Sequence, residues 1–234
     1  MTAAIECRYL KMDFGAAGAR QTVLRGVNLT ADAGHLTMIA GPSGCGKSTL
    51  LSILGGLLTP TSGEAIVFGR ALSAMSARER AAYRREDVGF IFQQYNLVPA
   101  LTAAENAAAA LIIAGEKREA AVARARAALA TLGLGEHCEK FPRQLSGGQQ
   151  QRVAIARALV HDPRLIICDE PTAALDSVTG EAVMEILSEV ARDRARAVVI
   201  VTHDPDIAKR TDRILTLVDG RLAADAVAQP PVRA

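Results

Sequence analysis

Several residue types that mark other functional classes are scarce or absent in this sequence. Tryptophan is missing, and aromatic residues make up 3% of the 234 residues. A stacking platform for single-stranded nucleic acid is not expected, because such platforms are built from aromatic side chains. The formal net charge is only +2, which does not indicate a surface for polyanions. We therefore expect no nucleic-acid partner.

The sequence is also poor in cysteine and in long apolar runs. Its four cysteines show neither CxxC spacing nor a cluster with histidine, which favours reduced thiols in a cytosolic protein over disulfides or zinc ligands. The most membrane-like run, residues 107–114, is far shorter than the roughly 20 apolar residues of a spanning helix. Charged residues interrupt the N-terminal segment, so we expect no signal peptide.

What is present fits an α/β protein. Hydrophobic residues make up 50% and charged residues 22%, which are ordinary globular values. The middle of the chain is rich in strong helix formers, whereas two later apolar runs have the continuous character of strands buried in a parallel sheet. We predict strands at residues 5–10, 27–31, 36–40, 64–68, 165–168 and 197–202, and helical segments at 47–58, 149–160 and 179–192, with residues 101–132 dominated by strong helix formers.

This pattern divides a single domain, residues 1–234, into parts. Residues 1–94 and 161–222 are predicted to form the α/β core. A mostly helical insert is expected over about residues 95–160, and a peripheral tail over 223–234. We find no tandem repeat and no low-complexity linker.

Residues 41–48, GPSGCGKS, match the pattern GxxxxGK[ST] at every fixed position. A predicted strand precedes them and a predicted helix follows, which is the context of a phosphate-binding loop. The glycines let backbone N–H groups face phosphates, Lys47 brings positive charge to the β- and γ-phosphates, and Ser48 brings a hydroxyl to Mg²⁺. GTPases, kinases, helicases and transport ATPases share this motif. The predicted nucleotide-binding residues are Gly41, Ser43, Gly44, Cys45, Gly46, Lys47, Ser48 and Thr49.

A second candidate site follows the apolar run 165–168. Its end delivers Asp169 towards a metal beside the phosphates, and Glu170, one residue later, can polarise a water for in-line attack on the γ-phosphate. An apolar strand with an acidic turn is common by itself. Beside a phosphate loop, it indicates nucleotide hydrolysis.

Residues 145–149, LSGGQ, form a second predicted helix N-terminus preceded by glycines, with Ser146 as its expected cap. Here the sequence resembles the ABC ATPase family, whose signature motif is LSGGQ. The resemblance runs from residue 5 to residue 222. It implies a P-loop NTPase core, an N-terminal antiparallel β subdomain, a helical insert, and ATP and Mg²⁺ as cofactors.

The resemblance also implies a homodimer in which each ATP lies between two subunits. The signature residues Ser146, Gly147, Gly148 and Gln149 would then contact the nucleotide bound to the phosphate loop of the partner subunit. Asp176, in the segment 174–176, matches the loop that crosses the interface of such dimers.

Further roles follow from the same family pattern. Gln93 matches the glutamine that senses Mg²⁺ and the attacking water; Gln94 is adjacent, but Gln93 directly follows an apolar strand. His203 matches the switch histidine at the γ-phosphate.

ABC domains also stack adenine on an aromatic residue near the N-terminus. Phe14 is the expected residue and Tyr9 the competitor, although either could be a core residue. Ala173 departs from the serine or glycine often found at its position.

The family implies that the protein powers a separate integral membrane permease from the cytoplasmic face of the inner (plasma) membrane. Segments 54–57, 61–63 and 174–180 resemble the MacB/LolD/DevA-type group, which implies export of a lipid, lipoprotein, haem or hydrophobic drug. Importer subunits for polar amino acids share the run 149–152, so import stays an alternative. A mechanical regulator and a nucleic-acid-associated ABC ATPase are further alternatives. Residues 95–99 are expected to help line a groove for the permease.

Overall fold

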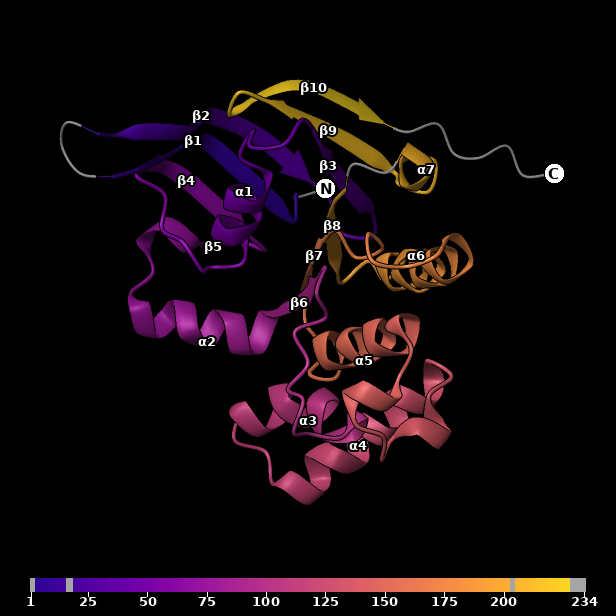
Figure 1. The fold of residues 1–234 in the computed structure, drawn as a ribbon. Helices are drawn as coiled ribbons and strands as arrows, with labels where there is room; N and C mark the ends of the chain where they lie inside the picture. The colour runs from indigo at the N-terminus through magenta and orange to yellow at the C-terminus, as the bar shows by residue number, and fades with distance from the viewer. Residues whose placement is uncertain (1–2, 16–18, 203–204, 228–234) are drawn as a thin grey trace.

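The computed structural model describes residues 3–15, 19–202 and 205–227 (Figure 1). Within these ranges, none of the helices combines the length and apolar character needed to cross a bilayer.

Two sheets form the α/β part of the protein. The smaller one is antiparallel, in the order β2-β1-β4-β5. Its hairpin strands extend beyond the predicted runs, because β-bulges let the exposed halves of β1 and β2 pair as well. The strands are β1 (Ile5–Phe14), β2 (Gln21–Ala31), β4 (Ser62–Val67) and β5 (Arg70–Ala71).

The larger sheet has six strands in the order β10-β9-β3-β8-β7-β6, parallel except for the edge strand β10. Every residue of β8 is buried, as its continuous apolar sequence predicts. These strands are β3 (Leu36–Ala40), β6 (Val88–Phe92), β7 (Leu165–Asp169), β8 (Ala197–Val201), β9 (Arg213–Val218) and β10 (Arg221–Val227).

The C-terminal strands differ from the sequence prediction. The expected tail boundary at residue 222 falls within β10, which is mostly exposed and pairs only with β9. Its alanine-rich sequence has little strand propensity of its own. Pairing with β9 and a bidentate ion pair from Arg213 to Asp225 hold it in the sheet.

The helices are α1 (Lys47–Leu54), α2 (Ala77–Asp87), α3 (Ala103–Ile113), α4 (Arg118–Thr131), α5 (Gly147–Leu159), α6 (Ser177–Ala191) and α7 (Pro205–Ala208). The helix-forming stretch of residues 101–132 contains two helices, because α3 and α4 are separated at Gly115, whose φ of 96° is left-handed. The helix predicted over residues 47–58 ends at Leu54, because Gly55 and Gly56 follow it.

Figure 1 shows α3 and α4 at the far end of the molecule from β1 and β2, with α5 between them and the larger sheet. Helix α5 contacts α3, α4, α6 and β6. One buried flank of α5 belongs to the hydrophobic cluster that packs on the sheet. The opposite flank belongs to a separate cluster shared with α3 and α4. Helix α5 is therefore the structural link between the sheet and the helical region.

Candidate functional site

The predicted site residues follow strands that end at the same edge of the larger sheet. Phe92 of β6 pairs in register with Asp169 of β7, which pairs with Val201 of β8, which pairs with Ile39 of β3. The phosphate-loop segment, Gln93 and Glu170 come directly after these strand ends. In open parallel sheets, this carboxyl edge is where ligands bind. The predicted His203 lies outside the described residues.

The phosphate-loop segment can be built only with glycine at two positions. A Cβ on Gly41, whose φ is 147°, would lie 2.1 Å from the carbonyl oxygen of Leu217. A Cβ on Gly46, whose φ is 107°, would lie 2.8 Å from the Leu24 side chain. Gly46 begins α1 with no side-chain cap and no acidic residue in the first turn. The first N–H groups of α1 are thus left to bind an anion.

Lys47 bends back across this loop. Its Nζ donates hydrogen bonds of 2.8 Å to the carbonyl oxygens of Gly41 and Pro42, and lies 3.9 Å from Sγ of Cys45. The ammonium group is therefore held at the centre of the loop. Phosphate oxygens can replace these carbonyl acceptors. Cys45 itself is only 4% exposed.

Asp169 faces the loop from the end of β7. Burial raises the pKa of its carboxyl group, and the negative charge of Glu170 raises it further. A hydrogen bond from the Ser48 hydroxyl and the positive charge of Lys47 act in the opposite direction and lower this pKa. A half-buried carboxylate beside a second carboxylate and a hydroxyl is electrostatically suited to a hard cation such as Mg²⁺.

Within the described ranges, no three His, Cys, Asp or Glu residues gather into a metal-binding group. The oxygen atoms of Ser48 and Asp169 nevertheless fit Mg²⁺, which usually takes one or two carboxylates and completes its shell with water and substrate phosphates. The donor set therefore suits a cation that takes its remaining ligands from water and phosphate.

Glu170 has an unusual backbone conformation. Its φ is 50°, in the left-handed region that non-glycine residues rarely adopt. Its N–H donates to the carbonyl of Val201 at 2.9 Å, and its own carbonyl accepts from the N–H of Ala173 at 3.3 Å. Such strain persists only where the surroundings hold it, and it concentrates at functional sites.

The segment after β6 is also held in an uncommon shape. Gln93 and Gln94 are exposed, and Tyr95 and Asn96 both have left-handed φ angles, of 55° and 48°. The guanidinium of Arg157 on α5 donates to both of their carbonyls, at 2.8 Å and 2.5 Å. Burial lowers the pKa of Arg157. Sequence reasoning missed this contact.

The signature segment begins α5 with a reciprocal cap, which confirms the predicted cap. Oγ of Ser146 accepts from the N–H of Gln149 at 3.3 Å, and Oε1 of Gln149 accepts from the N–H of Ser146 at 2.9 Å. Both side chains use acceptor atoms for the cap. The Ser146 hydroxyl hydrogen and the Gln149 Nε2 hydrogens thus stay available as donors.

The two glycines of this segment lie close to other elements. A Cβ on Gly148 would lie 2.1 Å from Cγ2 of Thr179 in α6, and one on Gly147 would lie 2.9 Å from the hydroxyl of Tyr95. The nearest packing partners of the signature segment are therefore α6 and Tyr95 rather than the phosphate loop.

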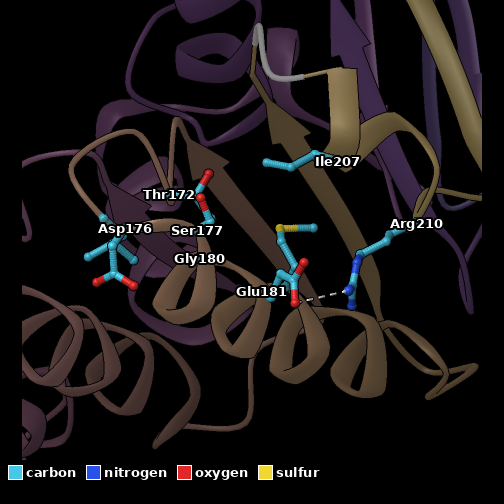
Figure 2. A pocket seen from close by; sticks show the side chains of 9 residues that line it. Thr172, Asp176, Ser177, Gly180, Glu181, Ile207 and Arg210 are labelled. Atoms are coloured by element: carbon cyan, nitrogen blue, oxygen red, sulfur yellow. Dashed lines mark ion pairs between the residues drawn. The ribbon is translucent and has the colours of Figure 1, made fainter.

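Asp176 caps α6. Its carboxylate accepts from the N–H of Thr179 at 3.0 Å and from its hydroxyl at 2.7 Å, and these bonds lower its pKa. Asp176 also lines a cavity of about 170 Å³ between α6 and α7. Figure 2 shows Glu181 and Arg210 on the other side of this cavity, in an ion pair of 4.0 Å.

Both aromatic candidates near the N-terminus are on β1 and both are exposed, Tyr9 by 73% and Phe14 by 40%. The interpretation of either as a core residue is therefore wrong. Which of the two contacts a base stays a prediction.

A groove of about 700 Å³ lies beside Arg157, between α2, β6, α3 and α5. Asn96 and Val98 line it, as the prediction for residues 95–99 requires. Sequence reasoning missed the rest of its lining, including Leu57, Arg84, Arg85, Phe90, Phe92 and Ile113. None of the described lining residues is acidic.

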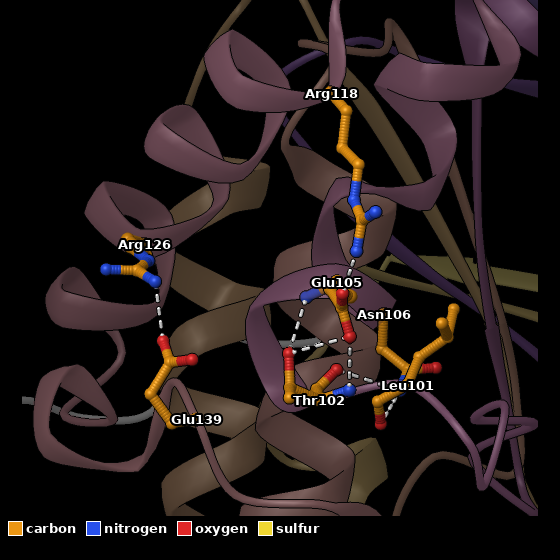
Figure 3. Close-up of polar contacts among 7 residues, drawn as sticks. All are labelled: Leu101, Thr102, Glu105, Asn106, Arg118, Arg126 and Glu139. Carbon is orange, nitrogen blue, oxygen red and sulfur yellow. Dashed lines mark hydrogen bonds and ion pairs between the residues drawn. The ribbon is translucent and has the colours of Figure 1, made fainter.

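A buried asparagine, Asn106, hydrogen-bonds the backbone of residues 98–102, the segment that forms the lip at the edge of this groove. Asn106 of α3 is 1% exposed, and its Oδ1 accepts from the N–H of Val98 at 2.7 Å. Its Nδ2 donates to the carbonyls of Val98, Leu101 and Thr102, and Figure 3 shows Asn106 with Leu101 and Thr102. The lip is thus fixed to the helical region.

Comparisons with known proteins agree on one family. Residues 24–173 match the family model described as "ABC transporter". The macrolide export ATP-binding/permease protein MacB of Rhodopseudomonas palustris is 47% identical over 226 residues, which are 97% of this chain and 34% of that protein. The uncharacterized ABC transporter ATP-binding protein MJ1508 of Methanocaldococcus jannaschii is 44% identical over 218 residues, covering 93% of this chain and 97% of that protein.

The chain therefore spans about a third of MacB and nearly all of MJ1508. Among solved structures, the dimeric post-hydrolysis state of the ATP-binding cassette MJ0796, bound to ADP and Pi, matches with a TM-score of 0.87 and 38% identity. The match covers 96% of this chain and 99% of that one. The likeness confirms the predicted fold: an α/β P-loop core with an antiparallel β subdomain and a helical subdomain.

Proposed function

This chain belongs to the ABC transporter family as an ATP-binding ABC-type ATP hydrolase, and we propose that it powers a separately encoded membrane permease that exports a lipophilic substrate. The observation that carries the proposal is the alignment of the strand ends of β3, β7 and β6, which gathers the phosphate loop, Asp169, Glu170 and Gln93 at one edge. Export is supported by the likeness to MacB, which is named for macrolide export.

For ATP, the proposed roles follow the site's chemistry. Lys47 and the N–H groups at the start of α1 bind the phosphates, and Phe14 stacks on adenine. Ser48, Asp169 and Gln93 hold Mg²⁺, which supplies charge neutralisation of the phosphates when bound. Glu170 accepts a proton from the attacking water, and His203 assists at the γ-phosphate.

The proposed active form is a homodimer. The MJ0796 cassette is dimeric with ADP and Pi bound, and the donors left by the Ser146–Gln149 cap suit the phosphate of a nucleotide on a second subunit. Asp176 caps α6, whose Thr179 packs against Gly148 of the signature segment. Since ATP would contact both subunits only in the closed dimer, ATP binding favours closure.

The groove beside Arg157 is the proposed permease site. Its floor is apolar, and the guanidinium groups of Arg84, Arg85 and Arg157 line it without a carboxylate among the described lining residues. An amphipathic permease helix with an acidic residue fits this chemistry. We place the subunit on the cytoplasmic face of the inner membrane, as its family likeness implies. The groove lies where a proposed helical subdomain of about residues 95–160 meets a proposed core of residues 1–94 and 161–222, with 223–234 peripheral.

The test is an affinity pull-down of tagged Glu170→Gln protein from detergent-solubilised membranes in the presence of ATP. We expect a permease in stoichiometric amount. Ile113→Glu, in the groove, should abolish its recovery, whereas Ile112→Glu, at the neighbouring exposed position outside the lining, should not.

Three results would contradict parts of the proposal. Recovery of nucleic acid or ribosomes in place of a permease would overturn the transport function and leave the ATP hydrolase. Recovery of an importer permease with a solute-binding protein would overturn export. A captured permease that shows no ATP-dependent flux in vesicles would indicate a mechanical regulator.

A further inference from the structure

Gln151 is a fully buried polar residue in α5, at 0% exposure. Its Nε2 donates a hydrogen bond of 2.7 Å to the carbonyl of Pro171. A carbonyl can only accept, so this contact fixes the orientation of the amide. The other amide atom, Oε1, is buried without a hydrogen-bond partner in the part of the chain that the structure describes.

An unpaired buried amide oxygen reduces the free energy of unfolding, which is not expected of a residue with a purely structural role. An apolar side chain of the same length would avoid that cost. What glutamine adds at this position is the bond to Pro171. The functional meaning of Gln151 therefore depends on what this carbonyl controls.

Pro171 directly follows Glu170, and the surrounding turn does not use its carbonyl. The turn's own backbone bonds run from Ala173 to the carbonyl of Glu170 and from Leu175 to the carbonyl of Thr172. On the other side, the N–H of Glu170 is bonded to Val201. The left-handed backbone of Glu170 is thus held between one anchor on β8 and one on α5.

We propose that Gln151 is a positioning residue for hydrolysis: through Pro171 it sets the Glu170 carboxylate, and it ties that carboxylate to the helix that begins with the signature segment. Gln151 is five positions after the cap residue Ser146, a rise of roughly 7.5 Å along α5. A shift of the signature end of α5 therefore reaches Glu170 within the same subunit.

Helix α5 holds the second proposed catalytic loop in the same way. Arg157 binds the carbonyls of Tyr95 and Asn96, just after Gln93. The two loops that would orient the attacking water are thus fixed to one rigid element. The groove lined by Arg157 and the signature segment lie on that same element.

This inference rests on the proposed role of Glu170, and the test separates the two. Gln151→Met conserves length and removes the donor. Steady-state ATP hydrolysis by the full chain should show kcat lowered roughly 10–30-fold, with KM for ATP changed less than about threefold. Val153→Ala, a buried apolar truncation on α5, is the matched control: it should lower the melting temperature and still leave kcat near wild type.

A double-mutant cycle with Glu170→Gln, followed by single-turnover hydrolysis, completes the test. If Gln151 acts through Glu170, adding Gln151→Met to Glu170→Gln lowers the rate no further. Independent, multiplying losses would overturn the inference, as would a Gln151→Met variant that behaves like Val153→Ala. Full hydrolysis in Glu170→Gln alone would instead overturn the role of Glu170 in the proposed function.

Discussion

The two buried clusters that meet at α5 are made of different side chains. On the sheet side, the cluster is dominated by Ile, Val, Leu and Met, with Ala158 and Ala191 as its only alanines among the described residues. On the helical side, half of the cluster is alanine. These alanines are Ala103, Ala104, Ala107, Ala108, Ala121, Ala125 and Ala156.

This difference separates a core of interlocking branched side chains from a core in which each residue buries little apolar area. Branched side chains on parallel strands interlock and fix the strand ends that carry the proposed site. Alanine lets α3, α4 and α5 approach closely but buries little area, about 0.8 kcal/mol less for each missing CH₂. The stability of the helical region therefore depends on a few larger residues such as Leu111 and Leu129.

The largest expected effect is at the sheet edge. Gly41→Ala should weaken ATP binding by roughly 100-fold or more, because its Cβ would overlap the carbonyl of Leu217 and displace the phosphate loop. Gly115→Ala, in the helical region, meets open space and should cost about 1 kcal/mol of stability through its left-handed φ alone. Calorimetric titration measures the ATP affinity of Gly41→Ala, and thermal unfolding measures the stability of Gly115→Ala. If Gly41→Ala bound ATP normally, the sheet edge would not be more sensitive to a small displacement than the helical region is.

A pair of core truncations sharpens the comparison. Leu129→Ala and Ile200→Ala each remove a fully buried side chain and should each lower the free energy of unfolding by about 3 kcal/mol. Only Ile200→Ala, on β8 between β3 and β7, should also weaken ATP binding, by roughly threefold or more. Urea unfolding and ATP titration test this. Equal effects of both variants on ATP affinity would show that the helical region is as tightly coupled to the site as the sheet.

The smallest effect concerns the start of α3. The N–H of Thr102 and the guanidinium of Arg118 hydrogen-bond the Glu105 carboxylate, and both lower its pKa (Figure 3). A lowered pKa means that this carboxylate stabilises the fold above its unfolded value of about 4.3, and that the contribution is lost as pH falls through the folded value. Thr102→Ala should cost about 1 kcal/mol at neutral pH.

Urea unfolding as a function of pH tests this cap. Glu105→Gln should be less stable than wild type at pH 7, and the difference should shrink as pH falls below the unfolded value of about 4.3 and disappear once pH is below the lowered folded pKa. Glu139→Gln is the control, because Glu139 pairs with Arg126 at an exposed position and should change little at any pH. A pH-independent loss in Glu105→Gln would assign its effect to packing.

Local sequence patterns predict the parts of the fold that depend on neighbouring residues. The buried strands β7 and β8 are readable because their apolar runs are continuous. Helix α2 was missed because it is highly charged and buries only Tyr83, although the Ser76 and Glu79 of its capping box are a readable start signal. Strands β9 and β10 are stabilised by pairing, which a local pattern does not contain.

The same limit applies to the site. The phosphate loop, the acidic pair after β7 and the signature segment are contiguous motifs, and their roles stay predictions based on family likeness. Gln151 and Arg157 were invisible as functional candidates, since their partners are 20 and more than 60 residues away in the sequence. A sequence alone does not show which backbone carbonyls a buried donor meets.

The capping boxes have a consequence for engineering. Helices α2 and α3 begin with the same reciprocal cap as α5, but they use Glu79 and Glu105 where α5 uses Gln149. A glutamate at position 149 would keep the cap and gain from the helix dipole. It would also remove the Nε2 donor and set a negative charge against the phosphate of the proposed second subunit's nucleotide. Selection for thermal stability alone would therefore favour Gln149→Glu, and the gain in stability would come with a loss of ATP hydrolysis.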